Sequence, residues 1–556
     1  MDRNNTEAHI LVTKNGNQKN MTGNADKQHL DVDVVVVGAG FAGLAMVRKL
    51  VEMGFSVRGF ERGAGVGGTW YWNRYPGARC DAPSMQYSYQ FSNELQQDWH
   101  WTELYAAQPE ILSYIEHVAE RFDISRHFTF DTTVNSLSFC EQSNIWTIKT
   151  SSSEVIKARF CIMATGNLSQ SLLPDFKGLG DFTGEWYQTS AWPKEPVDFS
   201  GKRVGVIGTG SSGIQAIPVI AENAEHLTVF QRTPQYSVPA RNKPTDPTYE
   251  ARIKADYPGF RARNYRKPIA TDIPMDPTTP KTFEVGEGER NRRYEDGWRK
   301  GGMVILFAFK DTTVTTEANE ALSQYLREKI REVVDDPDTA AKLTPDHLFG
   351  CKRPCMDTGY FETFNRANVS LVDCGKGIER IVPEGLVVEG TVHELDCIVF
   401  ATGFDAITGA LKEIDISGRN GAKLSEKWTL GPAAYLGLQS AGFPNLFTIS
   451  GPGSPSVLTN MVPTIEQHVN WIADALGHMQ EQNFLTIETT EEVEKPWMDK
   501  VRQLAESTLW GQCDNWYVGA NVPGKPRTFP IYVDWVSYLD KCNEVASNNY
   551  EGFLFS

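Results

Sequence analysis

Residues 34–46 read "VVVVGAGFAGLAM", a valine run followed by a glycine-rich turn. The four valines predict a short strand that is buried on both faces, and the apolar residues after the glycines predict a helix. Gly38, Gly40 and Gly43 have the G-x-G-x-x-G spacing of a dinucleotide-binding turn. The first glycine permits the tight turn, the second lets the backbone approach a pyrophosphate, and the third lets the helix pack against the strand.

A nucleotide bound at this turn would meet a carboxylate at the end of the next strand. The segment "SVRGFE" (56–61) predicts that strand and ends at Glu61. A carboxylate in this place accepts hydrogen bonds from a ribose diol and repels a 2′-phosphate, so the first site suits FAD or NAD. Besides the glycines and Glu61, we assign the turn residues Phe41 and Ala42 to this site.

A second fingerprint occurs at residues 203–215, "RVGVIGTGSSGIQ". Its glycines repeat the spacing of the first motif, again between a predicted strand and a predicted helix. The next strand, "LTVFQRT" (227–233), ends differently, because Arg232 stands where an acid would be expected. Arginine can bind a 2′-phosphate through two parallel hydrogen bonds, so the second site suits NADP(H). The residues assigned to it are Gly208, Thr209, Gly210, Ser211, Ser212, Gly213, Gln215 and Arg232.

Two nucleotides on one chain are most simply used for electron relay, in which NADPH gives a hydride to FAD and the reduced flavin passes electrons on. A disulfide acceptor would require a C-x-x-C motif beside the flavin, and the sequence contains none. Molecular oxygen needs no motif. The pair of fingerprints therefore predicts an oxygenase or an oxidase.

Composition limits the partners that such an enzyme could have. The chain has 556 residues and a formal net charge of −16, from 54 basic and 70 acidic side chains. Nucleic acids and anionic membranes attract basic surfaces, so neither is expected as a partner. No stretch is apolar for long enough to span a bilayer, and residues 1–31, which predict a disordered tail, lack the apolar core of a secretory signal. We therefore expect a cytoplasmic protein.

The nine cysteines are scattered and odd in number, which indicates reduced thiols and not a disulfide framework. Cys351 and Cys355, in "CKRPC", form the one close pair, and the two cations between them would favour thiolates. A redox couple there is the weaker alternative, because the spacing is not C-x-x-C. The histidines show no metal-binding spacing such as H-E-x-x-H, so we predict no metal, and the lack of a G-x-S-x-G elbow leaves serine-hydrolase chemistry unsupported.

Two further strands, "FCIMATG" (160–166) and "DCIVFATG" (396–403), each end in Ala-Thr-Gly and bracket the second fingerprint. This layout resembles the two-domain flavoprotein fold, an α/β fold with two Rossmann-like domains. The FAD-binding domain is then expected at 32–167 and 396–556, and the NADP-binding domain at 168–239 and 346–395. Residues 240–345 are charged and have helical periodicity, which predicts a helical subdomain inserted in the NADP domain.

Two amphipathic stripes support this division. In "EALSQYLREKIREVV" (320–334), Leu322, Tyr325, Leu326 and Ile330 lie on one face of a predicted helix. Near the C-terminus a similar stripe predicts a helix whose apolar face belongs to the core and not to a cofactor contact. Its members are Ile465, Val469, Ile472, Leu476 and Met479.

Residues 67–81 read "GGTWYWNRYPGARCD". This stretch resembles the flavin-contacting signature of the type I Baeyer–Villiger monooxygenases, G-G-x-W, four residues, Tyr-Pro-Gly and Asp, and every fixed position matches. Further matching segments extend the resemblance over nearly the whole chain after residue 30, and within that family the chain looks like the phenylacetone and cyclohexanone monooxygenases. These segments include "QPEILSYI", "VFQRTP", "FATGFDAITGAL", "GPGSPS" and "NWYVGANVPGKPR". One motif departs from the pattern: in "FTGEWYQTSAWP" (182–193), Gln188 stands where the family has histidine. We expect this substitution to be tolerated, and the alternative is weaker coupling of NADP binding to flavin chemistry, with leakage of peroxide.

The resemblance implies that NADPH reduces FAD and that oxygen forms a flavin peroxide, which attacks a ketone carbonyl to give an ester or lactone. It implies that Arg353 is the cation that keeps the peroxide anionic, and that Asp81 pairs with this arginine and holds it. A buried Asp–Arg pair is usually structural, so only the motif context assigns these two to catalysis. The remaining implied contacts are Gly68, Thr69, Trp70, Tyr75 and Asp81 along the flavin, and Lys352, Thr233 and Trp516 toward NADP.

Two other functions remain open at this point. The first is a flavin monooxygenase that oxidises nitrogen or sulfur, which would not need the arginine. The second is a flavin-binding protein whose redox state is detected by a partner protein, and it would oxidise NADPH slowly with every ketone. No motif specifies the ketone, although the loop "SPSVLTN" (454–460) is expected to shape the pocket. The expected partners are a small-molecule ketone and oxygen, and the expected assembly is a monomer.

Overall fold

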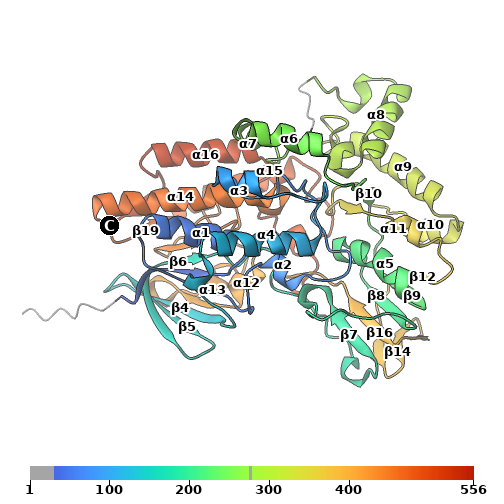
Figure 1. Ribbon diagram of the computed structural model, residues 1–556, viewed down its shortest axis with the longest axis horizontal. Helices are drawn as coiled ribbons and strands as arrows, with labels where there is room; N and C mark the ends of the chain where they lie inside the picture. Colours follow the sequence, from blue (N-terminus) through green and yellow to red (C-terminus); the bar gives the residue numbers. More distant parts are fainter. Residues whose placement is uncertain (1–29, 274–277) are drawn as a thin grey trace, which may run out of the picture.

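The computed structural model describes residues 30–273 and 278–556, so the predicted N-terminal tail lies almost entirely outside the described residues. Figure 1 shows two lobes side by side, with a mixed sheet under long helices on the left and a smaller parallel sheet at the lower right. A group of helices, α8 to α10, stands above the smaller sheet. The predicted α/β class, with two Rossmann-like domains and a helical insertion, is confirmed.

The larger sheet is built around the valine run of the first fingerprint. Strand β1 (Val32–Val37) pairs in parallel with β2 (Val57–Phe60) on one side and with β6 (Val155–Met163) on the other. Valine suits this central place because its branched side chain packs well on a pleated surface that is covered on both faces. The strand order is β17-β4-β5-β6-β1-β2-β3, and β18 also pairs with β6. The other bounds are β3 Phe128–Thr129, β4 Val134–Cys140, β5 Ile145–Thr150, β17 Asp415–Ser417 and β18 Leu446–Thr448.

Helices α1 (Phe41–Glu52) and α14 (Met461–Gln482) pack against each other in this lobe. All five residues of the predicted C-terminal stripe, which lie on α14, are buried, so the stripe belongs to the core. Ile465, at its start, also lines the large cavity described below, so the expectation that the stripe has no cofactor contact is not confirmed for this residue. Figure 1 shows α16 above α14, and α4 below it. Bounds of the other elements in this part are α2 Thr69–Trp72, α3 Asn93–Asp98, α4 Gln108–Arg121, α12 Gly409–Lys412, α13 Leu424–Lys427, α15 Glu491–Glu506, α16 Trp535–Ser547, β19 Ile487–Thr489 and β20 Phe553–Phe555.

The smaller sheet has five parallel strands in the order β12-β9-β8-β16-β7. The second fingerprint supplies β8 (Arg203–Ile207) and the following helix α5 (Ser211–Asn223). The remaining strands are β7 Glu185–Gln188, β9 His226–Gln231, β12 Val369–Asp373 and β16 Cys397–Phe400. A separate antiparallel sheet is formed by β13 Arg380–Val382, β14 Gly385–Val388 and β15 Thr391–Glu394.

The position of β16 corrects one expected domain boundary. We predicted that the FAD-binding domain resumes at residue 396, but β16 pairs with β7 and β8 and completes the NADP-type sheet. The Asp396 carboxylate also accepts a hydrogen bond from the backbone N–H of Arg203 at 2.8 Å, which fixes the start of β16 beside β8. An apolar strand fits the centre of either parallel sheet, so its composition could not tell the two apart.

The two Ala-Thr-Gly segments have the same structural role in their two sheets. Gly38 and Gly208 have φ angles of +105° and +108°, a region that favours glycine. A Cβ added to Gly38 would lie 2.5 Å from the carbonyl oxygen of Ala164, and one added to Gly208 would lie 2.5 Å from that of Ala401. Each Ala-Thr-Gly segment therefore lies directly against the first glycine of its fingerprint, and only glycine fits the contact.

Residues 240–345 are mainly helical, as predicted, but they do not form one compact unit. Residues of α6 (Pro247–Ala255) and α7 (Tyr257–Tyr265), such as Ile253 and Phe260, are buried in the core of the larger lobe. Residues of α8 (Glu287–Lys300) and α9 (Thr316–Val333) belong to a separate core. The predicted stripe lies on α9, followed by α10 Pro337–Leu343 and α11 Tyr360–Thr363, while β10 Ser237–Pro239 pairs with β11 Cys355–Asp357.

The cysteines correct a second expectation. Cys351 and Cys513 form a disulfide across a sequence separation of 162 residues, whereas the other seven cysteines, Cys355 among them, are free. The predicted absence of disulfides is therefore wrong for this pair, and the alternative pair of Cys351 and Cys355 is not formed. Sequence spacing could not reveal the bridge, because the fold brings Cys513 to Cys351 from a distant segment.

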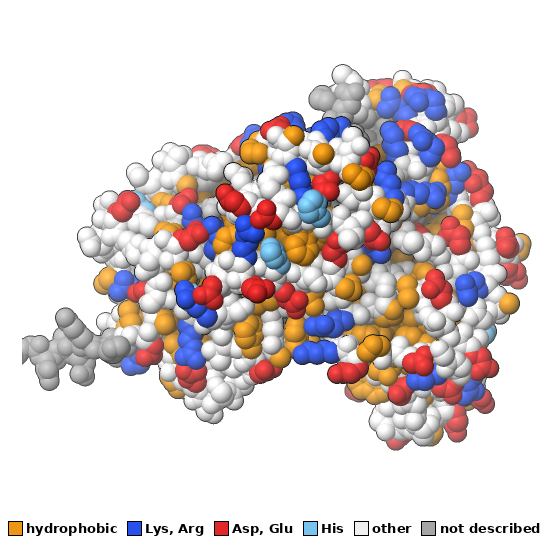
Figure 2. Space-filling view, viewed as in Figure 1, with side chains coloured by type: hydrophobic (Ala, Val, Ile, Leu, Met, Phe, Trp, Pro, Cys, Tyr) orange, Lys and Arg blue, Asp and Glu red, His pale blue; other side chains and the backbone are white. Residues whose placement is uncertain are grey.

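None of the helices in the described part of the chain is long and apolar enough to cross a bilayer. Figure 2 shows acidic and basic side chains interspersed over the visible face, with apolar side chains scattered among them.

Candidate active site

The first fingerprint lines a large cavity of about 690 Å³. Gly38, Gly40, Phe41 and Ala42 all contribute to its wall, and Gly40 precedes α1 without any side-chain cap on the helix. The first N–H groups of α1 are thus left for a ligand, and the helix dipole favours a negatively charged one. Gly43 does not line the cavity, because it faces the Gly38 carbonyl oxygen, where a Cβ would lie only 1.8 Å away. It allows close packing of helix on strand, as the motif predicts.

Glu61 lies at the end of β2 and is only 6% exposed, at the wall of the same cavity. Its two carboxylate oxygens accept hydrogen bonds from the backbone N–H groups of Ala39 and Gly63, each at 2.8 Å. These bonds fix the carboxylate where a ribose would lie beyond a pyrophosphate on α1. The arrangement fits the adenosine half of FAD.

Residues 67–70 form the next part of the wall. Gly68 has a φ of +55°, and a Cβ there would lie 2.8 Å from the Cα of Gly40, so the two glycine-rich segments are in close backbone contact. Thr69 and Trp70 begin α2 and line the cavity, and the Trp70 indole donates a hydrogen bond to the Tyr87 hydroxyl at 3.1 Å. This cradle of backbone and aromatic edges fits a flat ring system.

The second fingerprint opens toward the same cavity. Ser211, Ser212 and Gln215, at the N-terminus of α5, line it, and α5 also begins without a side-chain cap. Gly208, Thr209 and Gly210 form the turn before α5, and Gly213 lies in the first turn of that helix. These four residues do not line the large cavity.

Arg232 and Lys352 form a second positive site near this turn, outside the wall of the large cavity. Arg232 is exposed, and no acidic side chain of the described residues forms an ion pair with it. Burial lowers the pKa of Lys352, and the positive charge of the neighbouring Arg232 lowers it further. Thr233 lies beside them and accepts a hydrogen bond from the Thr209 hydroxyl at its carbonyl oxygen. Two adjacent cations at the end of β9 fit the 2′-phosphate of NADP(H).

Arg353 and Asp81 form an ion pair that joins the two halves of the molecule. Asp81 is the last residue of the 67–81 signature in the larger lobe, and Arg353 precedes β11, on the side of the NADP-type domain. Arg353 also donates a hydrogen bond to the carbonyl oxygen of Val457 at 2.6 Å. Burial by itself would lower the pKa of Arg353, but the Asp81 carboxylate outweighs it and raises the pKa, so the guanidinium is permanently charged.

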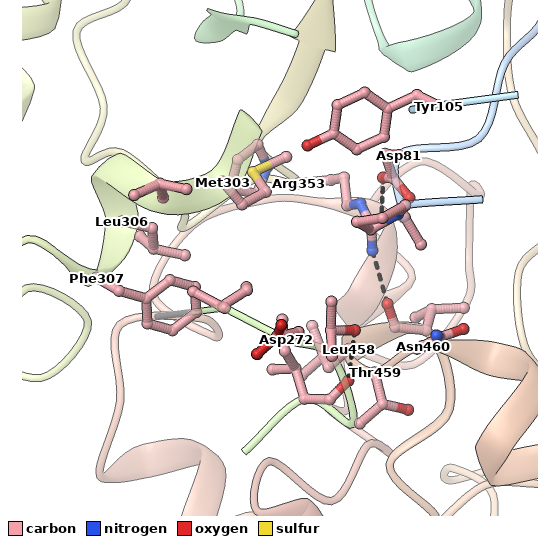
Figure 3. Close-up of a pocket in the computed structure, with 18 of the residues that line it drawn as sticks. Asp81, Tyr105, Asp272, Met303, Leu306, Phe307, Arg353, Leu458, Thr459 and Asn460 are labelled. Carbon is pink, nitrogen blue, oxygen red and sulfur yellow. Dashed lines mark hydrogen bonds and ion pairs between the residues drawn. The ribbon is translucent and has the colours of Figure 1, made fainter. Parts of the chain in front are cut away.

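A smaller cavity of about 190 Å³ lies on the other side of this ion pair. Figure 3 shows Arg353 between Asp81 and the loop of Leu458 to Asn460, with Met303 and Phe307 across the cavity. Asp81 and Arg353 line both cavities, so the ion pair stands at their junction. The 454–460 loop, which we expected to shape the pocket, contributes four consecutive residues to the small cavity. These are Val457, Leu458, Thr459 and Asn460.

Three other predicted residues lie at the boundary between the halves. The Tyr75 hydroxyl donates to the Gln215 side chain at 2.8 Å, so it contacts the NADP-type domain as well as the large cavity. Trp516 lies in a short turn and lines the large cavity. Gln188 ends β7 with its amide NH₂ buried and without a hydrogen-bond partner among the described residues. That Gln188 is tolerated stays a prediction.

The sequence did not point to several residues of the junction. The carbonyl of Val457 carries no side-chain signal, and Tyr105 and Thr271 reach the small cavity from segments without motifs. Tyr517 lies within the matching segment "NWYVGANVPGKPR", of which we assigned only Trp516. Tyr517 adjoins the predicted Trp516, and its hydroxyl is buried beside Arg353. Burial raises the pKa of Tyr517 to about 12, although the guanidinium opposes that rise, so it is a neutral phenol at ordinary pH.

Comparison with known proteins agrees with this geometry. Residues 31–252 match the model of the flavin-binding monooxygenase-like family. A Baeyer–Villiger monooxygenase of Pseudooceanicola batsensis is 40% identical over 94% of this chain and 96% of its own length. A phenazine N-monooxygenase of Lysobacter antibioticus is also 40% identical, over 95% of this chain and 97% of its own. A solved structure, an oxidised steroid monooxygenase bound to NADP, is 47% identical with a TM-score of 0.90, and covers 94% of this chain and 99% of that one.

Two nucleotide sites on either side of one arginine define a flavin-dependent, NADPH-using monooxygenase. At this identity over nearly the full length, the chain belongs to the Baeyer–Villiger monooxygenases of the flavin-binding monooxygenase family.

Proposed function

We propose that this enzyme uses NADPH and FAD to insert one atom of molecular oxygen beside the carbonyl of a small ketone, giving an ester or a lactone. The observation that carries the proposal is the Arg353–Asp81 ion pair at the junction of the two cavities. Among the described residues, this junction is the only place where a substrate in the small cavity could contact a flavin ring held in the large cavity.

The residues present fit both cofactors. The turn of Gly38 to Gly43 with Glu61 would hold the pyrophosphate and ribose of FAD, and residues 67–70 with Tyr75 would lie along its ring. The N-terminus of α5 with Arg232, Thr233 and Lys352 would hold NADP(H). When bound, the nicotinamide supplies the hydride, and the reduced flavin supplies the activated oxygen.

Arg353 would stabilise the negative charge that develops as oxygen is transferred to the ketone carbon. A fixed cation in a site shielded from water acts strongly on such charge and needs no reorganisation during the reaction. Asp81 and the Val457 carbonyl hold the guanidinium from two directions, so its position does not depend on the substrate. The carboxylate also prevents the arginine from being an unpaired charge when the cavity is empty.

The small cavity favours an apolar substrate. Its wall is mostly aliphatic and aromatic, and the charged ion pair lies at the end nearest the large cavity. A ketone would therefore place its hydrocarbon part among Met303, Leu306 and Phe307 and its carbonyl toward Arg353. We propose aryl-alkyl or small cyclic ketones as the substrate class.

Oxidation of nitrogen or sulfur is the second candidate, because one similar protein is a phenazine N-monooxygenase. A panel of linear, cyclic and aryl-alkyl ketones, with an amine and a sulfide beside them, separates the two. Mass spectrometry of the products under labelled oxygen should show esters or lactones that carry one labelled atom. N-oxide or S-oxide as the sole product, with every ketone returned unchanged, would overturn the proposal.

We also propose that the enzyme works in the cytoplasm as a monomer. Seven of the nine cysteines are free, which is typical of proteins from a reducing compartment.

A further inference from the structure

The disulfide joins the segment of the predicted active-site cation, Arg353, to the segment of Trp516. Cys351 precedes Lys352 and Arg353 directly, and Cys513 lies just before Trp516 in the sequence. Cys351 opens the stretch "CKRPC" that contains Lys352 and Arg353, whereas Cys513 belongs to no motif of the site. The covalent bridge therefore links the arginine at the junction of the cavities to a segment that borders both of them.

Hydrogen bonds between the same two segments depend on this proximity. The Lys352 ammonium donates to the carbonyl oxygen of Asp514 at 2.9 Å. The Asn515 amide donates to the carbonyl oxygen of Cys351 at 2.6 Å, and its side-chain oxygen accepts from the Val518 N–H at 3.1 Å. Asn515 thus begins the short helix η8 (Trp516–Val518) and ties it to the segment of Arg353.

The bridged segment borders each cavity with a different aromatic ring. Trp516 lines the large cavity and Tyr517 lines the small one, with their ring centroids 4.3 Å apart. Tyr517 is 1% exposed and lies beside Arg353. Displacement of this segment would therefore open both cavities next to the guanidinium and admit water there.

Non-covalent contacts also hold the segment, because Tyr517 packs in a small apolar cluster with Ile407 and Val457. The Asn521 amide donates to the Phe404 carbonyl oxygen at 2.7 Å, and Lys525 forms an ion pair with Asp405. Downstream, Arg527 donates to the Gly519 carbonyl oxygen at 2.8 Å. A three-residue helix forms no cooperative unit of its own, and the disulfide is the covalent constraint that ties it to the segment of Arg353.

A single disulfide in a chain whose other cysteines are free is characteristic of a redox-sensing pair and not of a structural framework. Cys513 is partly exposed, whereas Cys351 is 2% exposed. A thiolate reductant can therefore reach the Cys513 sulfur, and Cys351, which is followed by two cations, is the leaving thiolate.

We propose that Cys351 and Cys513 form a reversible redox site that controls whether the Trp516–Tyr517 segment is fixed against Arg353. In the reduced state the segment is released, and NADPH and oxygen are consumed with loss of hydrogen peroxide. That peroxide oxidises the pair: two thiols and one H₂O₂ give the disulfide and two waters. A dithiol reverses the step, because its two sulfurs become a disulfide while Cys351 and Cys513 each take up one proton.

This inference rests on the proposed function for the source of peroxide, but the first experiment does not. Purified holoenzyme is digested without reductant, and its peptides are mapped by mass spectrometry. A cross-linked peptide pair containing Cys351 and Cys513 is expected, which should disappear with a dithiol and return after a pulse of hydrogen peroxide. If the pair stays unlinked after the pulse, the site is not redox-active.

The second experiment asks whether the bridge fixes the segment. Cleavage by trypsin after the exposed Arg527 should be severalfold faster in the reduced wild type and in Cys513→Ser than in the oxidised wild type. The variant Cys140→Ser, which removes a free cysteine of β4, is the matched control and should behave as the wild type. Equal cleavage rates in both redox states would overturn the proposal.

The third measurement connects the bridge to turnover. Ester formed per NADPH consumed should fall at least twofold on reduction of the wild type and recover on reoxidation, whereas Cys513→Ser should stay low in both conditions. An unchanged ratio would overturn the redox control and leave the ketone-to-ester function standing. A complete lack of ester in every sample would contradict the function instead, and the peptide map and the cleavage rates would still report on the redox site.

Discussion

Arg353 carries a permanent charge between two cavities, and its neighbours explain how the fold tolerates it there. One-quarter of its side chain is exposed, and Asp81 and the Val457 carbonyl take up its N–H groups. A partly buried ion pair contributes little net stability, because desolvation of both charges offsets their attraction. The pair is therefore better explained by what it offers a substrate than by what it adds to the fold.

Replacing Arg353 with alanine should lower ester formation about a hundredfold, since loss of one fixed charge-stabilising group costs about 3 kcal/mol of barrier. NADPH oxidation should continue, with hydrogen peroxide as its product, because Arg353 is not among the groups proposed for hydride delivery. Ester by gas chromatography, NADPH by absorbance and peroxide by a peroxidase assay separate the two outcomes.

Arg266→Ala is the matched control for that experiment, because it removes an arginine paired with Asp540 on the surface, away from both cavities. It should leave the ester yield unchanged. Undiminished ester formation in Arg353→Ala would remove this residue from the chemistry.

His468 illustrates a residue whose effect is on stability alone. Its Nδ1 accepts a hydrogen bond from the Ser450 N–H at 2.9 Å, so the proton of the neutral ring is on Nε2, which meets the Tyr538 hydroxyl at 2.7 Å. Burial lowers the pKa of His468 to about 3. Protonation would place a hydrogen on Nδ1 against the Ser450 N–H, in a site without a carboxylate partner.

The folded state should therefore lose stability as the pH falls below the unfolded pKa of about 6.5 and toward the folded value of about 3. At pH 5 the loss from this one group is about 2 kcal/mol. The variant His468→Gln, which does not titrate, should show a flatter melting temperature between pH 7 and pH 5 than the wild type. Parallel curves for the two proteins would contradict the assignment.

The ends of strands β2 and β9 distinguish the two nucleotide sites at the level of elements. Both strands follow a fingerprint helix, but Glu61 comes directly after one strand and Arg232 directly after the other. Glu61 is held by two backbone N–H groups, while Arg232 is exposed beside Lys352. A carboxylate and a pair of cations at equivalent places explain why one sheet suits FAD and the other suits NADP(H).

Replacing Arg232 with alanine should raise the KM for NADPH about tenfold, because it removes a partly exposed charge-assisted hydrogen bond to the 2′-phosphate. The KM for NADH should change little, because NADH has no 2′-phosphate. Initial rates with each nucleotide at a saturating ketone concentration test this. An equal rise for both nucleotides would show that Arg232 acts on the fold of the turn and not on the phosphate.

The elements differ in how far the sequence could predict them. The fingerprints, α9 and α14 are specified by residues that are close in sequence, and the structure has them where the periodicity places them. The sheet that β16 joins and the partner of Cys351 both depend on which distant segment lies alongside in the fold. No local sequence pattern predicts which segment that is. The contact of Arg353 with the Val457 carbonyl could not be predicted for a third reason, because every residue has a backbone carbonyl and the sequence does not distinguish one from another.

At the scale of the whole molecule, the active site exists only where the two nucleotide-binding halves meet. Besides the Arg353–Asp81 pair, Gln215 of α5 joins them, since it accepts from the Tyr75 hydroxyl and donates to the Arg79 carbonyl oxygen at 3.0 Å. Gly77 lies between these residues with a φ of +83°, and a Cβ there would come 2.2 Å from the Gln215 carbonyl oxygen. The halves can approach this closely because position 77 has no side chain.

The variant Gly77→Ala should therefore separate the halves at the active site. The left-handed backbone costs about 1 kcal/mol with a Cβ, and the clash with backbone on α5 adds to it. Gly54→Ala is the matched control, because Gly54 has a similar φ of +84° with no atom within 4 Å of the added Cβ. Both variants should melt a few degrees below the wild type, but only Gly77→Ala should lose ester formed per NADPH consumed, since only there does Arg353 part from Asp81. If the melting temperature falls equally in the two variants and both form the same amount of ester per NADPH consumed, the contact at Gly77 does not hold the halves together.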